Sequence, residues 1–178
     1  MKKKHYLLIL FFVITAAMSA QDDKKYDLRL GLVFQKTEGL YWENGIAADV
    51  SSNYLLNKKI HLKFNYLSSR LGSGFGTNAI MQDNFILGAD WRFRAQKSFQ
   101  VMAGLNTGIF LVDYESDLFD VLPRSTMLFA AETGIFYQFK FPVSAGMVVG
   151  YNLINGNGVN VPGTLFPVYY RLSVFYNL

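Results

Sequence analysis

Apolar and polar side chains alternate along most of this chain, in segments of about ten residues between 26 and 178. The pattern is clearest over 100–111, where Val, Ala, Leu, Thr, Ile and Leu alternate with Gln, Met, Gly, Asn, Gly and Phe. Because successive side chains of an extended strand point to opposite faces, a period of two predicts β-strands. We expect eight strands, over 26–35, 45–54, 59–68, 84–93, 100–111, 127–139, 143–152 and 170–178.

The connections between these predicted strands alternate in length. Three are short, at 55–58, 94–98 and 140–142. Four are longer and contain glycine-rich turn sequences at 72–76 and 155–158; they span 36–44, 69–83, 113–126 and 153–165. Short turns at one end and longer loops at the other are typical of antiparallel barrels that span bacterial outer membranes. With an even number of strands, both chain ends then lie on the periplasmic side.

A soluble barrel or sandwich, with its apolar face turned inward, is the competing interpretation. Its outer face would need many Lys and Glu side chains, yet 98–112 and 141–153 contain no charged residue on either face. Such strands would be an aggregation hazard in water. Aromatic rings, which favour membrane interfaces, fall near the expected strand ends: Tyr26, Tyr54, Trp91, Phe93, Phe99, Tyr137, Phe139 and Tyr176 at one end, and Tyr66, Phe85, Tyr151 and Tyr170 at the other.

The first 20 residues have the three parts of a secretory signal peptide. A basic start is followed by an apolar run over 6–17 and by small residues before Ala20, and the run is too short for a spanning helix. We expect cleavage after Ala20, with a cut after Ala17 as an alternative and an uncleaved membrane anchor as the other reading. Residues 21–178 then form one barrel domain, because no linker or low-complexity stretch divides them.

The charge and cysteine content exclude several classes of function. The chain has 17 Lys and Arg against 13 Asp and Glu, but residues 1–20 contain three lysines and no acid, which leaves 14 against 13 after cleavage. A balanced charge gives no support to nucleic-acid binding. The absence of cysteine excludes disulfides, thiolate chemistry, Cys-based zinc sites and an N-terminal lipid-modified Cys.

The end of the chain alternates in the same way and matches a signal for barrel assembly: Tyr170, Leu172, Val174, Tyr176 and Leu178. With this ending, the export signal and the strand rhythm, the chain resembles the small eight-stranded outer-membrane proteins of the OmpA-transmembrane-domain and OmpX type. Members of that family commonly end in Phe, whereas this chain has Leu178. The Ala20–Gln21 junction also resembles those of Bacteroidota proteins.

The resemblance implies an all-β, eight-stranded antiparallel up-and-down transmembrane barrel in the outer membrane of a Gram-negative bacterium. It implies insertion by the barrel assembly machinery and contact with outer-membrane lipid and lipopolysaccharide. We expect a monomer that binds no nucleic acid and no cofactor. The likeness covers the whole mature chain, but it brings no catalytic or ligand-binding motif with it.

Charged residues also occur on the polar face, which turns toward the lumen in such a barrel. They are Arg29, Asp49, Lys63, Asp90, Arg92, Glu132 and Arg171, with Asp27 near the rim. An eight-stranded barrel has an interior only wide enough for side chains to fill. Buried charges must therefore pair, because desolvation costs several kcal/mol each. We expect a salt-bridged plug, with a narrow polar path for ions or small solutes as the alternative.

Other motifs give weaker signals. His61 is the only histidine after cleavage; it could act as a general base, but it falls beside a short turn and we expect a lumen or turn residue. One histidine without clustered carboxylates predicts no metal site. The glycines of 72–76 lack the strand–loop–helix context of a phosphate loop. The acidic segment 113–120 has oxygens for Ca²⁺ but not the spacing of an EF-hand, so we expect a solvated loop.

The sequence therefore predicts a non-enzymatic outer-membrane barrel with a structural or loop-mediated surface role. A small pore or carrier for ions or apolar solutes is the second hypothesis. A lipid-modifying enzyme is the third, disfavoured by the number and position of histidines.

Overall fold

The computed structural model describes residues 26–37, 42–73, 76–95, 97–114, 124–154 and 168–178. These contain eight strands: β1 (Tyr26–Thr37), β2 (Trp42–Ser52), β3 (Ile60–Ser73), β4 (Gly76–Phe93), β5 (Phe99–Tyr114), β6 (Ser125–Gln138), β7 (Val143–Ile154) and β8 (Val168–Asn177). Within this part of the chain we find no helix with the length and apolarity to cross a membrane. The expected signal peptide lies outside the described residues.

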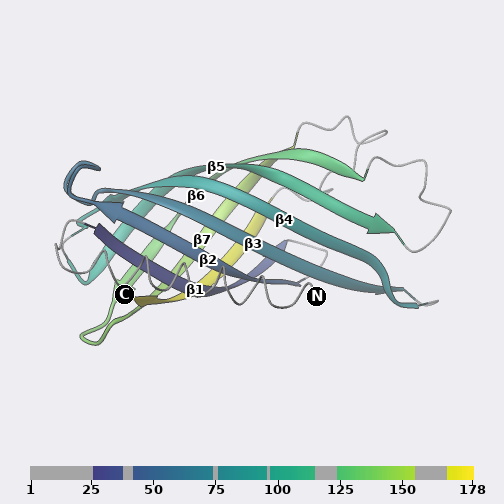
Figure 1. The fold of residues 1–178 in the computed structure, drawn as a ribbon, viewed down its shortest axis with the longest axis horizontal. Helices are drawn as coiled ribbons and strands as arrows, with labels where there is room; N and C mark the ends of the chain where they lie inside the picture. The colour runs from purple at the N-terminus through teal and green to yellow at the C-terminus, as the bar shows by residue number, and fades with distance from the viewer. Residues whose placement is uncertain (1–25, 38–41, 74–75, 96, 115–123, 155–167) are drawn as a thin grey trace, which may run out of the picture.

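Each strand pairs antiparallel with the next, and β1 pairs with β8 to close a barrel (Figure 1). The closing register places Arg29 opposite Asn177 and Phe34 opposite Leu172. A closed sheet leaves no strand edge, so the backbone groups along the ladder are satisfied within the wall. The predicted fold class, an eight-stranded antiparallel up-and-down barrel, is confirmed.

Side chains along each strand alternate between the outer surface and the interior of the barrel, with the period of two seen in the sequence. Large apolar side chains point outward and stay exposed, as in Leu105 at 70 % and Leu87 at 59 %. Their neighbours in sequence point inward and are buried, as Asn106 and Ile86 are. We call the outward apolar surface the apolar belt; on β5 it comprises Val101, Ala103, Leu105, Thr107, Ile109 and Leu111.

The two ends of the barrel differ. We call the end that carries the connections 53–59, 94–98 and 139–142 the turn end, and both Tyr26 and Leu178 lie there. We call the other end the loop end; it carries the connections 38–41, 74–75, 115–124 and 155–167. Outward aromatic side chains cluster at the turn end, where the Tyr26 and Tyr54 rings lie 6.5 Å apart and the Tyr137 and Phe139 rings 5.0 Å apart.

The observed strand bounds depart from the sequence-based ones mainly at the loop end. β3 and β4 extend to Ser73 and from Gly76, so most of the expected loop 69–83 is strand. Similarly, β2 begins at Trp42, inside the expected loop 36–44. At the turn end β2 stops at Ser52, so Tyr54 lies in the turn rather than on the strand. The strands stay paired by backbone hydrogen bonds beyond the apolar belt, where the sequence no longer alternates between apolar and polar residues.

The turn between β2 and β3 has an uncommon backbone. Three successive residues without glycine, Leu56, Asn57 and Lys58, have φ of 49°, 54° and 62°. The turn is closed by hydrogen bonds from Lys58 N and Leu55 N to the carbonyl oxygen of Ser52. An ion pair of 2.9 Å between Lys58 Nζ and Asp27 Oδ1 ties it to the start of β1.

Candidate functional site: the barrel interior

Among the residues that the structure describes, the barrel interior contains eight buried charged side chains, four of each sign. They are Arg29, Lys63, Arg92 and Arg171 against Glu43, Asp49, Asp90 and Glu132. All come from inward positions of the strands, so the period of two that builds the apolar belt also brings these charges together. Seven of them form three clusters along the barrel axis, and Arg29 stands apart.

The central cluster is organised around Glu132 on β6. Its carboxylate accepts hydrogen bonds from Arg171 Nη1 at 3.0 Å, Tyr169 Oη at 2.5 Å and Asn106 Nδ2 at 2.7 Å, and it also pairs with Lys63. Lys63 Nζ in turn lies 2.5 Å from Asp90 Oδ1. Five strands thus meet at one network in which two cations balance two anions.

A second cluster lies nearer the turn end. Asp49 on β2 pairs with Arg92 on β4, and its other oxygen lies 2.7 Å from His61 Nδ1. His61 Nε2 lies 3.1 Å from the carbonyl oxygen of Lys58, which holds the ring against the β2–β3 turn. The Arg92 guanidinium stacks over the Phe136 ring, with 4.1 Å between its central carbon and the ring centre. We call these residues the inner cluster.

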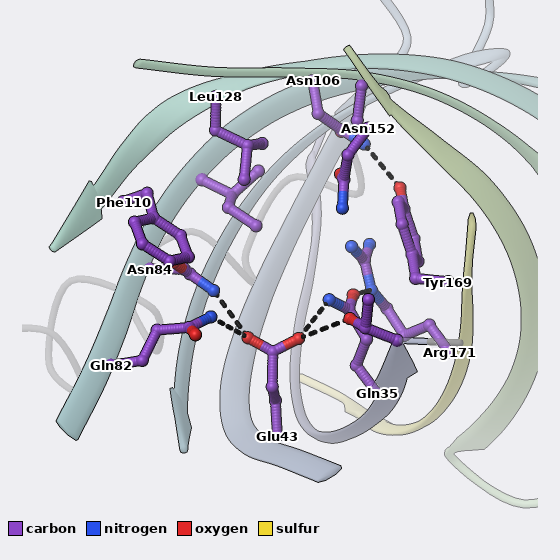
Figure 2. Close-up of a pocket in the computed structure, with 13 residues that line it drawn as sticks. Gln35, Glu43, Gln82, Asn84, Asn106, Phe110, Leu128, Asn152, Tyr169 and Arg171 are labelled. Atoms are coloured by element: carbon purple, nitrogen blue, oxygen red, sulfur yellow. Dashed lines mark hydrogen bonds between the residues drawn. The ribbon is translucent and has the colours of Figure 1, made fainter. Parts of the chain in front are cut away.

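The third group, near the loop end, surrounds Glu43 with neutral donors (Figure 2). Gln82 Nε2 and Asn84 Nδ2 donate to Oε1 at 2.9 and 2.6 Å, and Gln35 Nε2 donates to Oε2 at 2.6 Å. Gln35 also accepts a hydrogen bond of 3.0 Å from Arg171 Nε, which links Glu43 to the central cluster. We call this group the outer cluster.

Little space remains between these clusters. A cavity beside Glu43, Gln35 and Arg171 has a volume of about 10 Å³, which is roughly the room that one water molecule needs. A larger cavity of about 340 Å³ lies at the turn end, lined by Asp27, Arg29, Ala95, Lys97, Ser98, Gln100, Gln138, Asn177 and Leu178. The two cavities share no lining residue, and the Asp49–Arg92 pair lines neither.

The structure places all seven charged lumen candidates inside the barrel: Arg29, Asp49, Lys63, Asp90, Arg92, Glu132 and Arg171. It joins six of them in ion pairs. Arg29 differs, because among the described residues it has no carboxylate within 4 Å and no hydrogen-bond partner. The five residues of the expected assembly signal, Tyr170, Leu172, Val174, Tyr176 and Leu178, are exposed on the outer surface at the end of the chain.

The remaining motifs are placed only in part. His61 is a buried lumen residue beside the turn, with 2 % of its surface exposed. Of the acidic segment, Asp113 faces outward 3.7 Å from Arg124, while 115–120 lies outside the described residues, as do the turn sequence 155–158 and residues 74–75. The part of the chain that the structure describes holds no group of three or more His, Asp or Glu arranged to bind a metal.

The sequence analysis missed Glu43, the eighth buried charge, because it fell within a predicted loop. Its partner Gln82 was missed for the same reason, whereas Asn84 fell within the predicted strand 84–93 and was not singled out because it carries no charge. One signal was available, since Gln35, Glu43 and Asn84 each continue the inward parity of their strand. Polar residues on that parity extend the lumen beyond the apolar belt.

Comparison with known proteins adds information on the fold. No protein-family model matches this chain, and no curated protein sequence matches it. Solved structures do match. The N-terminal β-barrel domain of Pseudomonas aeruginosa OprF has a TM-score of 0.62 at 11 % identity and covers 85 % of this chain and 97 % of that domain. Neisserial surface protein A has a TM-score of 0.55 at 12 % identity, with 88 % and 97 % covered.

A third structure, the outer-membrane protein OprG from Pseudomonas aeruginosa, has a TM-score of 0.51 at 14 % identity, with 87 % and 96 % covered. Identities this low carry information on architecture and none on ligands, since one fold hosts many functions. The matches nevertheless span nearly all of each solved barrel. The chain therefore has the fold of the small eight-stranded outer-membrane β-barrels.

Proposed function

We propose that this protein spans the outer membrane of a Gram-negative bacterium, with its loop end outside and its turn end in the periplasm, and that it acts without catalysis. Its role is to support the envelope through the surface at its loop end. The apolar belt supports the location: side chains such as Leu105 and Leu87 would be unfavourable in water and suit a lipid core of about 25 Å. Outward aromatic side chains border this belt.

The filled interior is the observation that carries the proposal. Glu132 binds Lys63, Arg171 and Tyr169 at once, so side chains from opposite walls meet at the axis. Water-filled pores occur in barrels with many more strands, whereas an interior of eight strands fills with side chains. The middle of the lumen therefore serves as a plug, and recognition is left to the surfaces at the two ends of the barrel.

The setting of His61 supports a role without catalysis. Both of its ring nitrogens are engaged, by Asp49 and by the carbonyl oxygen of Lys58, and the side chain is buried at the turn end. A lipid substrate in the outer leaflet would meet the loop end instead. Within the described residues, no histidine lies at the loop end to act as a general base.

Complementation of a deletion strain tests the proposal. We would measure uptake of a hydrophobic dye by cells that carry the wild-type protein or a variant with residues 156–166 shortened to a four-residue turn. We expect the wild type to restore the dye barrier and the shortened variant to fail, although it remains heat-modifiable on gels like a folded barrel. Full restoration by the shortened variant would contradict a role for the loop end.

Lipid A mass spectra from the same strains separate the enzymatic alternative. We expect identical spectra with and without the protein. A lipid A species that appears with the wild type and disappears with His61→Ala would overturn the non-catalytic assignment. Single-channel conductance measurements separate the pore alternative.

A further inference from the structure

The turn end contains a cation whose charge is not balanced locally. Near this end lie Arg29, Arg92 and Asp49, and Asp49 forms its ion pair with Arg92. Arg29 stands opposite Asp49 in the β1–β2 register but more than 4 Å from any described carboxylate. The central cluster is neutral and Glu43 lies at the other end. The interior as a whole is thus balanced but polarised along the axis, with one excess positive charge at the turn end.

Arg29 lines the cavity of about 340 Å³ at this end. Arg29 is only 8 % exposed as a whole residue, and it forms no ion pair with a described carboxylate. A buried charge in this state is costly unless it is paired. The volume is at the lower limit of small-molecule pockets, which measure about 300–1,000 Å³.

The other walls of the cavity leave Arg29 as its main charged donor. Gln100 Nε2 donates to the Ala95 carbonyl at 2.8 Å, and Gln138 Nε2 donates to the Val143 carbonyl at 3.0 Å, so both amides are already engaged. Asp27 at the rim is paired with Lys58. Lys97 and Ser98 supply an ammonium and a hydroxyl nearer the solvent.

We propose that this cavity is a binding site for a small organic carboxylate, held by Arg29. The planar guanidinium matches a carboxylate with two parallel hydrogen bonds. Arg29 is the one buried cation among the described lining residues, and Lys97 lies nearer the solvent, so the inner part of the pocket suits a monoanion better than the more highly charged phosphate. In the orientation proposed above the site opens to the periplasm, but binding itself does not depend on that orientation.

Fluorine NMR on the full mature barrel in lipid nanodiscs tests the site, with 4-fluorobenzoate as the probe. We expect saturable binding to the wild type and a loss of affinity of about tenfold or more in Arg29→Gln, which removes a charge-assisted hydrogen-bond pair. The control Lys140→Gln removes an exposed cation at the same end, outside the cavity, and should change affinity less than twofold. Equal binding by Arg29→Gln and the wild type would overturn the proposal.

Two further experiments, a competition assay and a chemical-shift map, use the unmodified protein. The neutral methyl ester of the probe should not compete with it, and inorganic phosphate should compete less well than acetate at equal concentration. Competition by the ester, or better competition by phosphate than by acetate, would overturn the assignment to a monoanionic carboxylate. The probe should also shift the backbone amide resonances of Ser98 and Asn177 while leaving those of Gln82 and Asn84 unchanged. Shifts confined to the loop end would place the site elsewhere.

Discussion

Glu132 shows how single residues determine what this barrel can do. Its side chain is buried, yet it has four partners, two of them cationic. Removal of a charge from water costs several kcal/mol, so such a network is stable only when every member is paired. Gly150 makes room for this network, because a Cβ there would overlap the Tyr169 side chain, whose hydroxyl donates to Glu132.

Neutralising Glu132 should therefore destabilise the barrel strongly. In Glu132→Gln, Lys63 and Arg171 lose a buried counter-charge, and we expect the free energy of unfolding to fall by about 3–5 kcal/mol. Urea unfolding in lipid vesicles, followed by tryptophan fluorescence, measures this change. Asp113→Asn is the matched control, because its partner Arg124 is exposed and the change should stay within about 0.5 kcal/mol. Similar losses in both variants would refute a cooperative plug.

At the scale of strands, the sequence predicted the elements well where lipid-facing alternation marks them. β5 and β7 are examples, since one face of each is apolar over most of its length and the observed bounds agree within a few residues. The loop-end halves of β3 and β4 were missed. Beyond the belt the outward residues are polar, as Arg70 and Asp83 are, 3.2 Å apart. There the ladder is maintained by hydrogen bonds, which leave no hydrophobic period in the sequence.

The candidate site was predictable only in part for the same reason. The alternation along a strand shows that Arg92 and Glu132 face the lumen. It does not show which residues they contact, because a contact across the barrel depends on strand tilt and register. The Arg92–Asp49 pair joins β4 to β2, and the Glu132–Lys63 pair joins β6 to β3. Nor could parity show that Arg29 is left unpaired.

The β2–β3 turn offers a prediction about backbone strain. Leu56 is exposed and has φ of 49°, a region that costs a residue with a side chain about 1–3 kcal/mol. We expect Leu56→Gly to raise the free energy of unfolding by about 1 kcal/mol. Leu55→Gly, one residue earlier and without positive φ, should lower it by about 0.5–1 kcal/mol. A loss of stability in Leu56→Gly, measured by the same unfolding assay, would refute the strain.

For the whole molecule, an apolar belt that faces lipid implies a stability effect that depends on depth. An arginine introduced in the middle of the belt should destabilise the barrel more than one at its edge. Leu105 lies in the middle of β5, opposite Ala89 and Ala131, and Phe99 lies at the turn end of the same strand. We expect Leu105→Arg to destabilise the barrel in vesicles by about 2–4 kcal/mol and Phe99→Arg by about 1 kcal/mol or less. Small and equal effects in urea titrations would show that this face is not in lipid.

The central claim is that paired side chains close the lumen, so that the protein acts through its surfaces and not as a channel. Single-channel recording in a planar bilayer tests this most directly, with the refolded barrel added at the lowest concentration that gives insertion. We expect the inserted protein to show no steady openings of a defined amplitude. Steady openings whose conductance changes in Glu132→Ala or Arg171→Ala would contradict it, because ions would then be passing through the central cluster.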